Sequence, residues 1–353
     1  MGKKNYNVIG VMSGTSLDGI DVAFLHFEKK EQWTFSIQEA TTYSYSENWK
    51  LILQNLHQAS PATLAKKEIL YTRLLGETIL KFIDSNGIES IDLVSSHGHT
   101  VFHEPAVGKT YQIGNQEALS KQLGKTVVCD FRTQDVLLGG QGAPLVPMGD
   151  VLLFSDYDAC LNLGGFANGS MYQNNEVYAY DLCAVNTVLN WLAEKKGMPF
   201  DSGGAIAKKG ILIHALFNAL EALDFYKTSP PKSLGIEWVN AIIFPLLAEF
   251  YDYKLEDIMH TYSKHISLEI SRNFNKKQRV LVTGGGAKNT FLISALKNDC
   301  QATLIFPEDK LIDFKEALIF GFLGVLRVRN EVNCLASVTG ASMNHSSGNV
   351  FYP

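Results

Sequence analysis

The chain has 353 residues, of which 46% are hydrophobic, so it is long enough for a large core and favours two domains. Its net charge of −5 and the lack of a long basic run argue against binding to nucleic acid or to an anionic membrane. The five scattered cysteines contain no C-x-x-C, which argues against a disulfide framework or a zinc knuckle and favours reduced thiols in the cytoplasm. No apolar run approaches the ~18 residues of a membrane span.

Along the first half of the chain, the sequence predicts strands that alternate with helices. A β-hairpin is expected from two apolar runs joined by a glycine-rich bend, and a long helical stretch is expected to break at a Ser-Pro pair. The predicted strands are 8–12, 20–27, 91–95 and 126–129, and the predicted helices are 49–85, with its break at 60–61, and 115–123.

The second half repeats this alternation after a Gly/Pro-rich stretch without periodicity, 130–148, within which we expect 139–144 to be a hinge or an active-site loop. Strands alternating with helices indicate an α/β protein. The predicted strands are 159–163, 177–180, 280–283 and 302–306, and the predicted helices are 186–196, 203–223, 237–250, 254–273, 290–298 and 314–329.

Three glycine-rich turns, 10–19, 161–168 and 282–289, each follow an apolar run. Such turns expose backbone N–H groups, and a row of N–H groups can hold phosphate. The pattern therefore favours a nucleotide held between two lobes. None of the turns is a Walker A motif or a G-x-G-x-x-G motif, so a Rossmann dinucleotide site has no support.

The first turn also carries polar side chains that suit a γ-phosphate and its metal ion. Asp18 would face Mg²⁺ directly or through water. The alternative is a plain hairpin turn, for which Asp-Gly is a standard sequence. The side chains concerned are Ser13, Thr15, Ser16 and Asp18.

Residues 96–104 contain three histidines in an H-x-H-x₃-H pattern. Zinc binding is one interpretation. A polar substrate-binding loop that uses His97, Thr100 and Glu104 is preferred, and the third alternative is a strand end with ordinary surface histidines. Downstream, Arg132 lies between two carboxylates and could clamp a substrate carboxylate or form an ion pair that fixes its loop.

Two further carboxylates have both a functional and a structural interpretation. Asp181 ends a predicted strand, where it could act as a general base or cap the following helix. Glu316 follows Asp313 at the spacing of a capping box, so spacing alone gives it a structural role.

Together these motifs closely resemble the signatures of the anhydro-N-acetylmuramic acid kinase family. The first of them is Val11-Met-Ser-Gly-Thr-Ser-Leu-Asp-Gly-Ile-Asp21. The other matching blocks span essentially the whole chain in family order: 96–105, 112–115, 139–147, 161–168, 283–287, 316–320 and 337–342.

The resemblance implies the two-lobed, ribonuclease-H-like fold of sugar kinases, heat-shock ATPases and actin, with ATP and Mg²⁺ in the cleft between the lobes. It places the N-terminal lobe at 1–135 plus 337–353 and the C-terminal lobe at 136–336. The residues that it assigns to the nucleotide are Gly14, Thr15 and Asp18 for the phosphates, Gly164 and Gly165 in a second phosphate turn, and Gly284, Gly285 and Gly286 in the adenosine turn.

The resemblance also implies a reaction of cell-wall recycling. A water opens the 1,6-anhydro bridge of 1,6-anhydro-N-acetylmuramic acid, and the freed O6 takes the γ-phosphoryl group of ATP. Asp181 would be the base, Glu316 would position the water, and the sugar would be bound by His97, Thr100, Glu104 and Arg132. The family further suggests a homodimer in the cytoplasm.

Two departures from the family pattern bear on activity. Leu-Cys-Ala-Val follows Asp181 where relatives carry Thr-Gly-Pro-Gly, and the segment 131–135 contains one arginine where many relatives carry three. The alternative functions are therefore a kinase for another anhydro or amino sugar, and a non-catalytic nucleotide-binding regulator.

Overall fold

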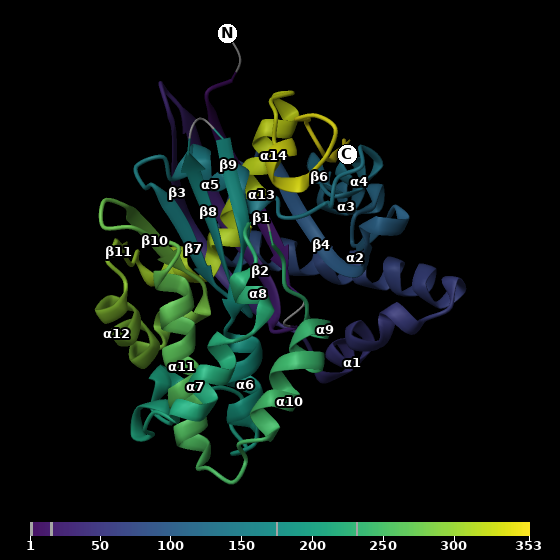
Figure 1. The fold of residues 1–353 in the computed structure, drawn as a ribbon. Helices are drawn as coiled ribbons and strands as arrows, with labels where there is room; N and C mark the ends of the chain where they lie inside the picture. Colours follow the sequence, from purple (N-terminus) through teal and green to yellow (C-terminus); the bar gives the residue numbers. More distant parts are fainter. Residues whose placement is uncertain (1–2, 15–16, 174–175, 231) are drawn as a thin grey trace. The chain divides into compact units, whose positions relative to one another are not determined.

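The computed structural model describes residues 3–14, 17–173, 176–230 and 232–353 (Figure 1). The chain forms two compact units: unit 1 comprises 1–154 and 314–353, and unit 2 comprises 155–313. Residues 136–154 and 314–336, which the sequence analysis placed in the second lobe, thus belong to unit 1. The reason is packing: Gly149 lies against Ile319, and Ser95 Oγ donates to the Phe320 carbonyl at 2.5 Å.

Unit 1 contains a seven-stranded sheet in the order β12-β6-β4-β1-β2-β3, with β5 also paired to β4. The predicted hairpin is confirmed, because β1 and β2 pair antiparallel from Asn5↔Glu28 to Met12↔Asp21. β4 and β6 run parallel to β1. The strands are β1 (Asn5–Ser13), β2 (Gly19–Lys29), β3 (Trp33–Ser44), β4 (Leu93–Glu104), β5 (Lys109–Ile113), β6 (Val127–Cys129) and β12 (Asn349–Phe351).

Helices of unit 1 cover both faces of this sheet, and successive residues of β1 contact different helices. Ile9 and Val11 join the core formed with α2, whereas Gly10 faces the backbone of α13 at Ala317. The predicted break at Ser60-Pro61 is confirmed, since the Ser60 hydroxyl caps α2 by accepting from the Thr63 N–H. The helices are α1 (Glu47–Asn55), α2 (Pro61–Ser85), α3 (Glu117–Leu123), α4 (Thr133–Leu137), α5 (Val146–Leu153), α13 (Asp309–Val328) and α14 (Ala336–Thr339).

Unit 2 contains a five-stranded sheet in the order β11-β10-β7-β8-β9 and its own hydrophobic core. Its strands are β7 (Ala159–Leu163), β8 (Phe166–Gln173), β9 (Glu176–Ala184), β10 (Arg279–Thr283) and β11 (Thr303–Ile305). Its helices are α6 (Asn186–Glu194), α7 (His214–Glu221), α8 (Asp224–Lys227), α9 (Ile236–Trp238), α10 (Phe244–Ala248), α11 (Leu255–Ser271) and α12 (Thr290–Asp299).

Three local predictions were wrong, each for an identifiable reason. Helix 203–223 shrinks to α7, because Gly203 and Gly204 adopt φ of +63° and +72°. The stretch 130–148, expected to lack regular structure, contains α4 and the start of α5, whereas the predicted loop 139–144 lies between these two helices. The proposed capping box is also wrong, since Asp313 does not precede a helix: it lies within α13, just before a kink at Phe314 (φ −113°), and its carboxylate pairs with Lys288 at 2.6 Å.

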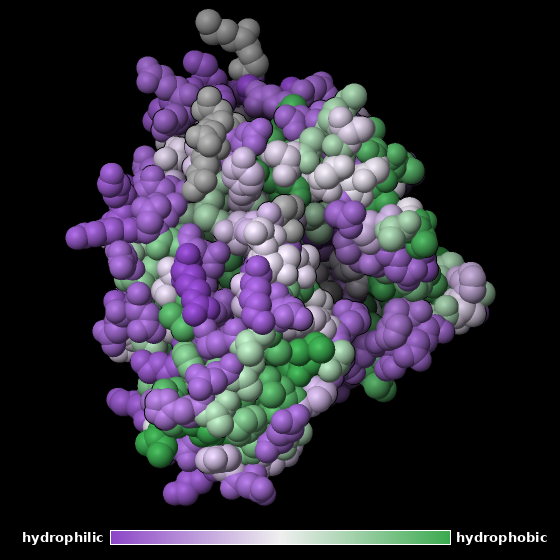
Figure 2. All heavy atoms as spheres, in the orientation of Figure 1, coloured by the Kyte–Doolittle hydropathy of each residue, from purple (hydrophilic) through white to green (hydrophobic). Residues whose placement is uncertain are grey.

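Apolar side chains gather on one visible part of unit 2. Figure 2 shows hydrophobic residues over α9 and α10, where Ile236 and Ile242 are exposed. Elsewhere on the same face the residues are mostly hydrophilic. Among the described residues, no helix is both long and apolar enough to cross a membrane.

The contact between β1 and α13 predicts a stability effect at Gly10. A Cβ there would collide with the Ala317 carbonyl oxygen and lie 2.7 Å from Leu25 Cδ1. We expect Gly10→Ala to lower the free energy of unfolding by about 1–3 kcal/mol, measured by urea denaturation. Gly169→Ala in β8 is the control, because its new Cβ would meet nothing closer than 3.7 Å. Equal stability of the two variants would contradict this account of the packing.

Candidate functional site

In unit 1, the parallel strands β1 and β6 both end beside the middle of β4, which itself continues to Glu104. Ser13 at the end of β1 pairs in register with His99 of β4, and Ser96 of β4 pairs with Cys129 of β6. Carboxyl ends of parallel strands are where α/β proteins commonly bind ligands. The sequence-predicted residues of this unit are therefore carried by one sheet edge and by α13.

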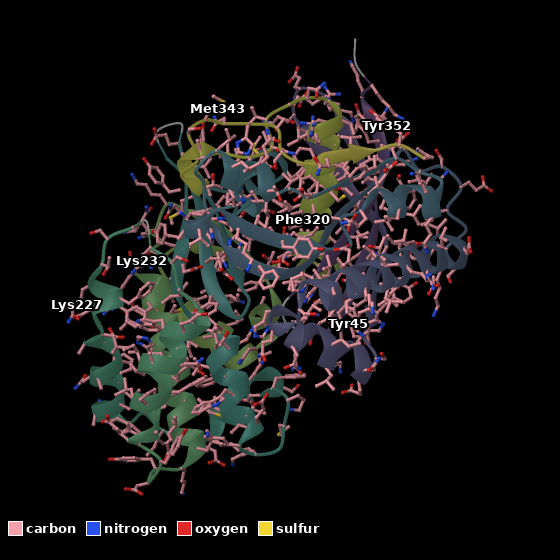
Figure 3. All side chains as sticks on the ribbon, turned by 90° about the vertical axis from the view of Figure 1, so that its right-hand side faces the viewer. Tyr45, Lys227, Lys232, Phe320, Met343 and Tyr352 are labelled. Atoms are coloured by element: carbon pink, nitrogen blue, oxygen red, sulfur yellow. The ribbon has the colours of Figure 1, made fainter. Side chains whose placement is uncertain are left out.

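The Ser13 hydroxyl belongs to a buried polar network. It accepts from the Tyr71 hydroxyl at 3.0 Å, lies 2.5 Å from the Tyr45 hydroxyl and 3.1 Å from His99 Nδ1. Tyr45 is labelled in Figure 3. Burial lowers the pKa of His99 to about 4, so its ring is neutral near pH 7. These hydrogen bonds fix the end of β1. They also use the Ser13 hydroxyl, which the sequence analysis expected to bind a phosphate.

The turn after Ser13 carries the remaining phosphate candidates of unit 1. Gly14 is half-buried and Asp18 is exposed. Thr15 and Ser16 lie outside the described residues. A solvent-exposed carboxylate offers the hard oxygen ligand that Mg²⁺ prefers, so Asp18 fits the proposed metal in chemical type.

Arg132 and His97 form the best-defined contact among the sugar-side candidates. Arg132 Nε donates to His97 Nε2 at 2.9 Å, and Arg132 Nη1 donates to the Gly142 carbonyl at 2.6 Å. His97 Nδ1 lies 2.8 Å from the Gly98 carbonyl, and the ring packs 4.6 Å from Phe320, labelled in Figure 3. Burial, then the charge of Arg132, holds the pKa of His97 well below its usual value. A neutral His97 can accept this hydrogen bond.

Glu316 lies in α13, and the charges of Asp21 and Arg132 act on its pKa in opposite directions. Its side chain reaches solvent, yet desolvation by the surrounding protein raises its pKa. The negative charge of Asp21 raises it further, whereas Arg132 opposes the shift. Burial lowers the pKa of Arg132 to about 10, and Glu316 partly offsets this. Asp21 was missed as a candidate, although it closes the first signature motif.

The remaining sugar-side candidates lie further along the β4–β5 hairpin. Thr100 is half-buried and pairs with Gln112, while Glu104 is exposed and lies 3.5 Å from Lys109. The segment 96–104 is part of β4 rather than the expected loop. Gly98 within it adopts a φ of +75°.

In unit 2, two of the glycine turns lie side by side. β7 and β10 run parallel, with Thr283 opposite Asn162, so both strands end at the same edge. A Cβ at Gly284 would lie 2.8 Å from the Leu163 backbone, and one at Gly286 would lie 2.8 Å from the Leu163 Cβ. Only glycine permits this approach, which explains Gly284 and Gly286.

The helix α6 begins against the first of these turns. The Val185 N–H donates to the Gly165 carbonyl at 2.8 Å, and the Asn186 N–H donates to the Gly164 carbonyl at 3.2 Å. The Asn186 side chain also donates to the Leu163 carbonyl at 3.2 Å, and it lies 3.9 Å from a Cβ built on Gly285. Asn186 therefore links both turns, a role that its spacing alone did not reveal.

Asp181 lies in β9, opposite Asn168 of β8. Its Oδ2 accepts from the Leu234 N–H at 2.8 Å and from the Ser233 hydroxyl at 3.1 Å, and its own N–H donates to the Lys232 carbonyl at 3.0 Å. Burial raises the pKa of Asp181, and the two donors oppose the shift. The carboxylate is thus fixed in orientation and made more basic than a free aspartate. Its position within β9, before α6, argues against the helix-cap alternative.

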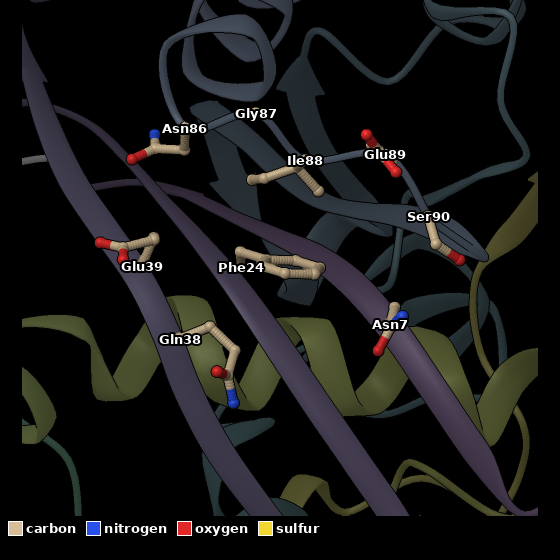
Figure 4. A pocket seen from close by; sticks show the side chains of 9 residues that line it. All are labelled: Asn7, Phe24, Gln38, Glu39, Asn86, Gly87, Ile88, Glu89 and Ser90. Carbon is tan, nitrogen blue, oxygen red and sulfur yellow. The ribbon is translucent and has the colours of Figure 1, made fainter.

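Unit 1 also has a separate surface hollow, which is lined by residues of β1, β2 and β3 and by the turn after α2 (Figure 4). Phe24 of β2 lies in it between Asn7 of β1 and Glu39 of β3, and the turn 86–90 forms another part of its lining. Its nine lining residues include none of the predicted site residues.

The sequence profile described as anhydro-N-acetylmuramic acid kinase matches residues 6–353. The chain belongs to the anhydro-N-acetylmuramic acid kinase family. An anhydro-N-acetylmuramic acid kinase of Zymomonas mobilis is 31% identical over 98% of this chain and 99% of its own length. Another from Pseudomonas putida is 38% identical over 82% of each chain. A solved structure, the activator of 2-hydroxyisocaproyl-CoA dehydratase from Clostridium difficile with bound ADPNP, has a TM-score of 0.45 and 14% identity, covering 92% of this chain and 97% of its own.

The family membership confirms the resemblance and the α/β prediction agrees with the two sheets. The structure also shows how the departure after Asp181 is accommodated. β9 continues through Ala184, the residues 182–185 are fully buried, and Val185 has a φ of −121°. Apolar side chains therefore anchor this segment in the core of unit 2 with a backbone that needs no glycine.

The burial of His99 predicts a pH effect on stability. A histidine titrates near pH 6.5 when unfolded and near 4 here, so protons favour the unfolded state in between. Stability should fall as pH drops from about 6.5 to 4, by at most about 1.4 kcal/mol per pH unit from this residue. We expect His99→Gln to make that slope shallower in denaturation curves. The exposed His57→Gln is the control, and an unchanged slope in His99→Gln would refute the assignment.

Proposed function

We propose that this chain is an ATP-dependent kinase that opens the 1,6-anhydro bridge of 1,6-anhydro-N-acetylmuramic acid and phosphorylates O6. The products are N-acetylmuramic acid 6-phosphate and ADP. The observation that carries the proposal is Asp181, a carboxylate that is oriented by two donors, has a raised pKa and matches the family's base in a chain that belongs to that family.

Asp181 accepts a proton from a water as the water oxygen bonds to the anomeric carbon of the sugar. The bond between that carbon and O6 breaks, and its electron pair stays on O6, which forms a bond to the γ-phosphorus of ATP as ADP departs. A partly buried base suits this step, because its raised pKa brings it closer to the working pH. Glu316, whose pKa is also raised, is the second carboxylate for which we propose a role, as the family resemblance implies.

The paired turns of unit 2 are proposed to bind the nucleotide. Backbone N–H groups near Gly164 and Gly165, close to the start of α6, suit phosphate oxygens, while Gly284 to Gly286 suit the adenosine. The triple-glycine turn fits this role, because a Cβ at Gly285 would meet only the Asn186 amide, at 3.9 Å. Gly14, with Thr15, Ser16 and Asp18 of the first turn, is assigned to the remaining phosphate oxygens and, through Asp18, to Mg²⁺, which would neutralise phosphate charge. Ser13 is left out, because its buried hydroxyl is already bonded within the protein.

Arg132 is proposed to bind the carboxylate of the sugar's lactyl group, with His97, Thr100 and Glu104 binding its other polar groups. Arg132 is held by His97 and Gly142, so little conformational freedom is left to lose when a ligand binds. Since a single arginine serves here where many relatives carry three, a sugar panel should include anhydro sugars without the lactyl group. Because the reaction consumes ATP, we place it in the cytoplasm, within peptidoglycan recycling, with the family's homodimer as the proposed assembly.

Replacing the proposed base should separate catalysis from binding. We expect Asp181→Asn to abolish product formation, measured as sugar phosphate by mass spectrometry, and to leave ATP binding by calorimetry within a few-fold of the wild type. Glu176→Gln is the control, an exposed carboxylate on the same strand. Near-normal turnover of Asp181→Asn would remove this residue as the base, and loss of ATP binding would indicate a structural role instead.

The loop that orients Asp181 predicts a shift in the pH profile. Ser233→Ala removes one donor to Oδ2, so the pKa of Asp181 should rise and the acid limb of kcat/KM should move to higher pH, by up to about one unit. Ser229→Ala, an exposed serine nearby in sequence, is the control. A shift toward lower pH would contradict the proposed basic role of Asp181.

A further inference from the structure

A buried cluster of three different metal-ligating side chains lies in unit 1, next to the glycine-rich loop that holds Arg132. Its members are Asp135 of α4, and Cys334 and His345, which flank α14. Their ligand atoms all lie within 4.8 Å of one another. Asp135 is fully buried, and Cys334 and His345 are 1% and 6% exposed.

The backbone fixes these side chains relative to one another. Cys334 and His345 face each other in an antiparallel bridge, with N–H to carbonyl distances of 3.1 and 3.2 Å in the two directions. The Cys334 thiol donates to Asp135 Oδ1 at 3.0 Å, and the Thr339 hydroxyl donates to the same oxygen at 2.7 Å. The cluster is therefore assembled by the fold and needs no loop closure.

The ring of His345 is the feature that points to a bound cation. Its Nδ1 lies 3.1 Å from the carbonyl of Met343, labelled in Figure 3, and a carbonyl can only accept, so Nδ1 carries the proton. In a neutral ring, Nε2 then presents a lone pair. This atom is buried without a hydrogen-bond partner among the described residues, and it lies 3.6 Å from Asp135 Oδ1. A lone pair aimed at a carboxylate is unfavourable, so either a second proton on the ring or a metal ion must lie between the two atoms.

We propose that Asp135, Cys334 and His345 bind one Zn²⁺ ion, with Thr339 or a water as the fourth ligand. Zinc accepts this mixture of sulfur, nitrogen and oxygen, and tetrahedral ligands lie roughly 3.3–3.7 Å apart. The observed 3.6 Å for the nitrogen–oxygen pair fits, and the 3.0 Å for the sulfur–oxygen pair needs only a small opening. On binding, the thiol releases its proton to solvent, and the thiolate and carboxylate neutralise the ion.

The ion would have a structural role close to Arg132. The other oxygen of Asp135 accepts the Gly142 N–H at 2.6 Å, and the Gly142 carbonyl accepts from Arg132. The Gln141 N–H also donates to the Thr339 carbonyl at 2.8 Å. Zinc at this point would tie α4, the loop at 139–142 and the C-terminal segment together.

The test is the zinc content of the full-length protein, with any affinity tag removed, after growth in zinc-supplemented medium and dialysis into metal-free buffer. We expect one zinc per chain by plasma mass spectrometry, and loss of most of it in Cys334→Ser and in His345→Gln. Cys300→Ser, which removes a buried cysteine outside the cluster, should retain it. Metal-free protein titrated with Co²⁺ should show a thiolate-to-cobalt charge-transfer band.

Three results would overturn the proposal. One is a wild type with no more zinc than His345→Gln, which would indicate a protonated His345 paired with Asp135. Another is zinc retained in both cluster variants, which would place the ion elsewhere. If the variants fail to fold by circular dichroism, the wild-type cobalt spectrum decides, and the absence of the thiolate band counts against the site.

Discussion

The parallel pairing of strands within each sheet is the constraint on which both parts of the candidate site depend. In unit 2 it brings the ends of β7 and β10 to one edge, so that Leu163 and Gly284 come within a distance that only glycine allows. In unit 1 the strands β1 and β6 end on either side of β4, which brings Ser13 and the segment that leads to Arg132 close to the part of β4 that carries His97. Residues far apart in sequence become neighbours because successive parallel strands end together.

Burial then sets the chemistry of these neighbours. His97 stays neutral under desolvation and the charge of Arg132, and so it accepts a hydrogen bond from the guanidinium instead of repelling it. Asp181 and Glu316 both become weaker acids for the same primary reason, which suits groups that exchange or orient a proton near neutral pH. Desolvation thus raises the pKa of both carboxylates for which we propose a chemical role.

Much of this organisation could be predicted from the sequence. The hairpin of β1 and β2, the break before Pro61 and the strand at 159–163 are local patterns, and they were predicted correctly. The glycine turns were recognised as such, but their adjacency follows from strand pairing across more than 100 residues, which no local pattern encodes. The roles of Asn186 and Asp21 were missed for that reason, since each depends on a partner distant in sequence.

The segment after Asp181 shows the converse limit. A family resemblance alone made the loss of two glycines and a proline seem disruptive, whereas the structure buries Leu182, Cys183, Ala184 and Val185 in the core of unit 2. Hydrophobic burial can fix the conformation of this segment without glycine or proline. Fully burying a side chain such as Leu182 or Val185 contributes about 1.5–3 kcal/mol.

The central claim is a coupled hydrolysis and phosphoryl transfer, and it is tested most directly by incubating purified protein with Mg-ATP, with and without 1,6-anhydro-N-acetylmuramic acid. ADP release and the mass of the sugar product are measured together. The account predicts ADP release that requires the sugar, and a product heavier than the substrate by one water and one phosphoryl group. ATP binding without sugar-dependent ADP release, or a phosphorylated product that has gained no water, would contradict it.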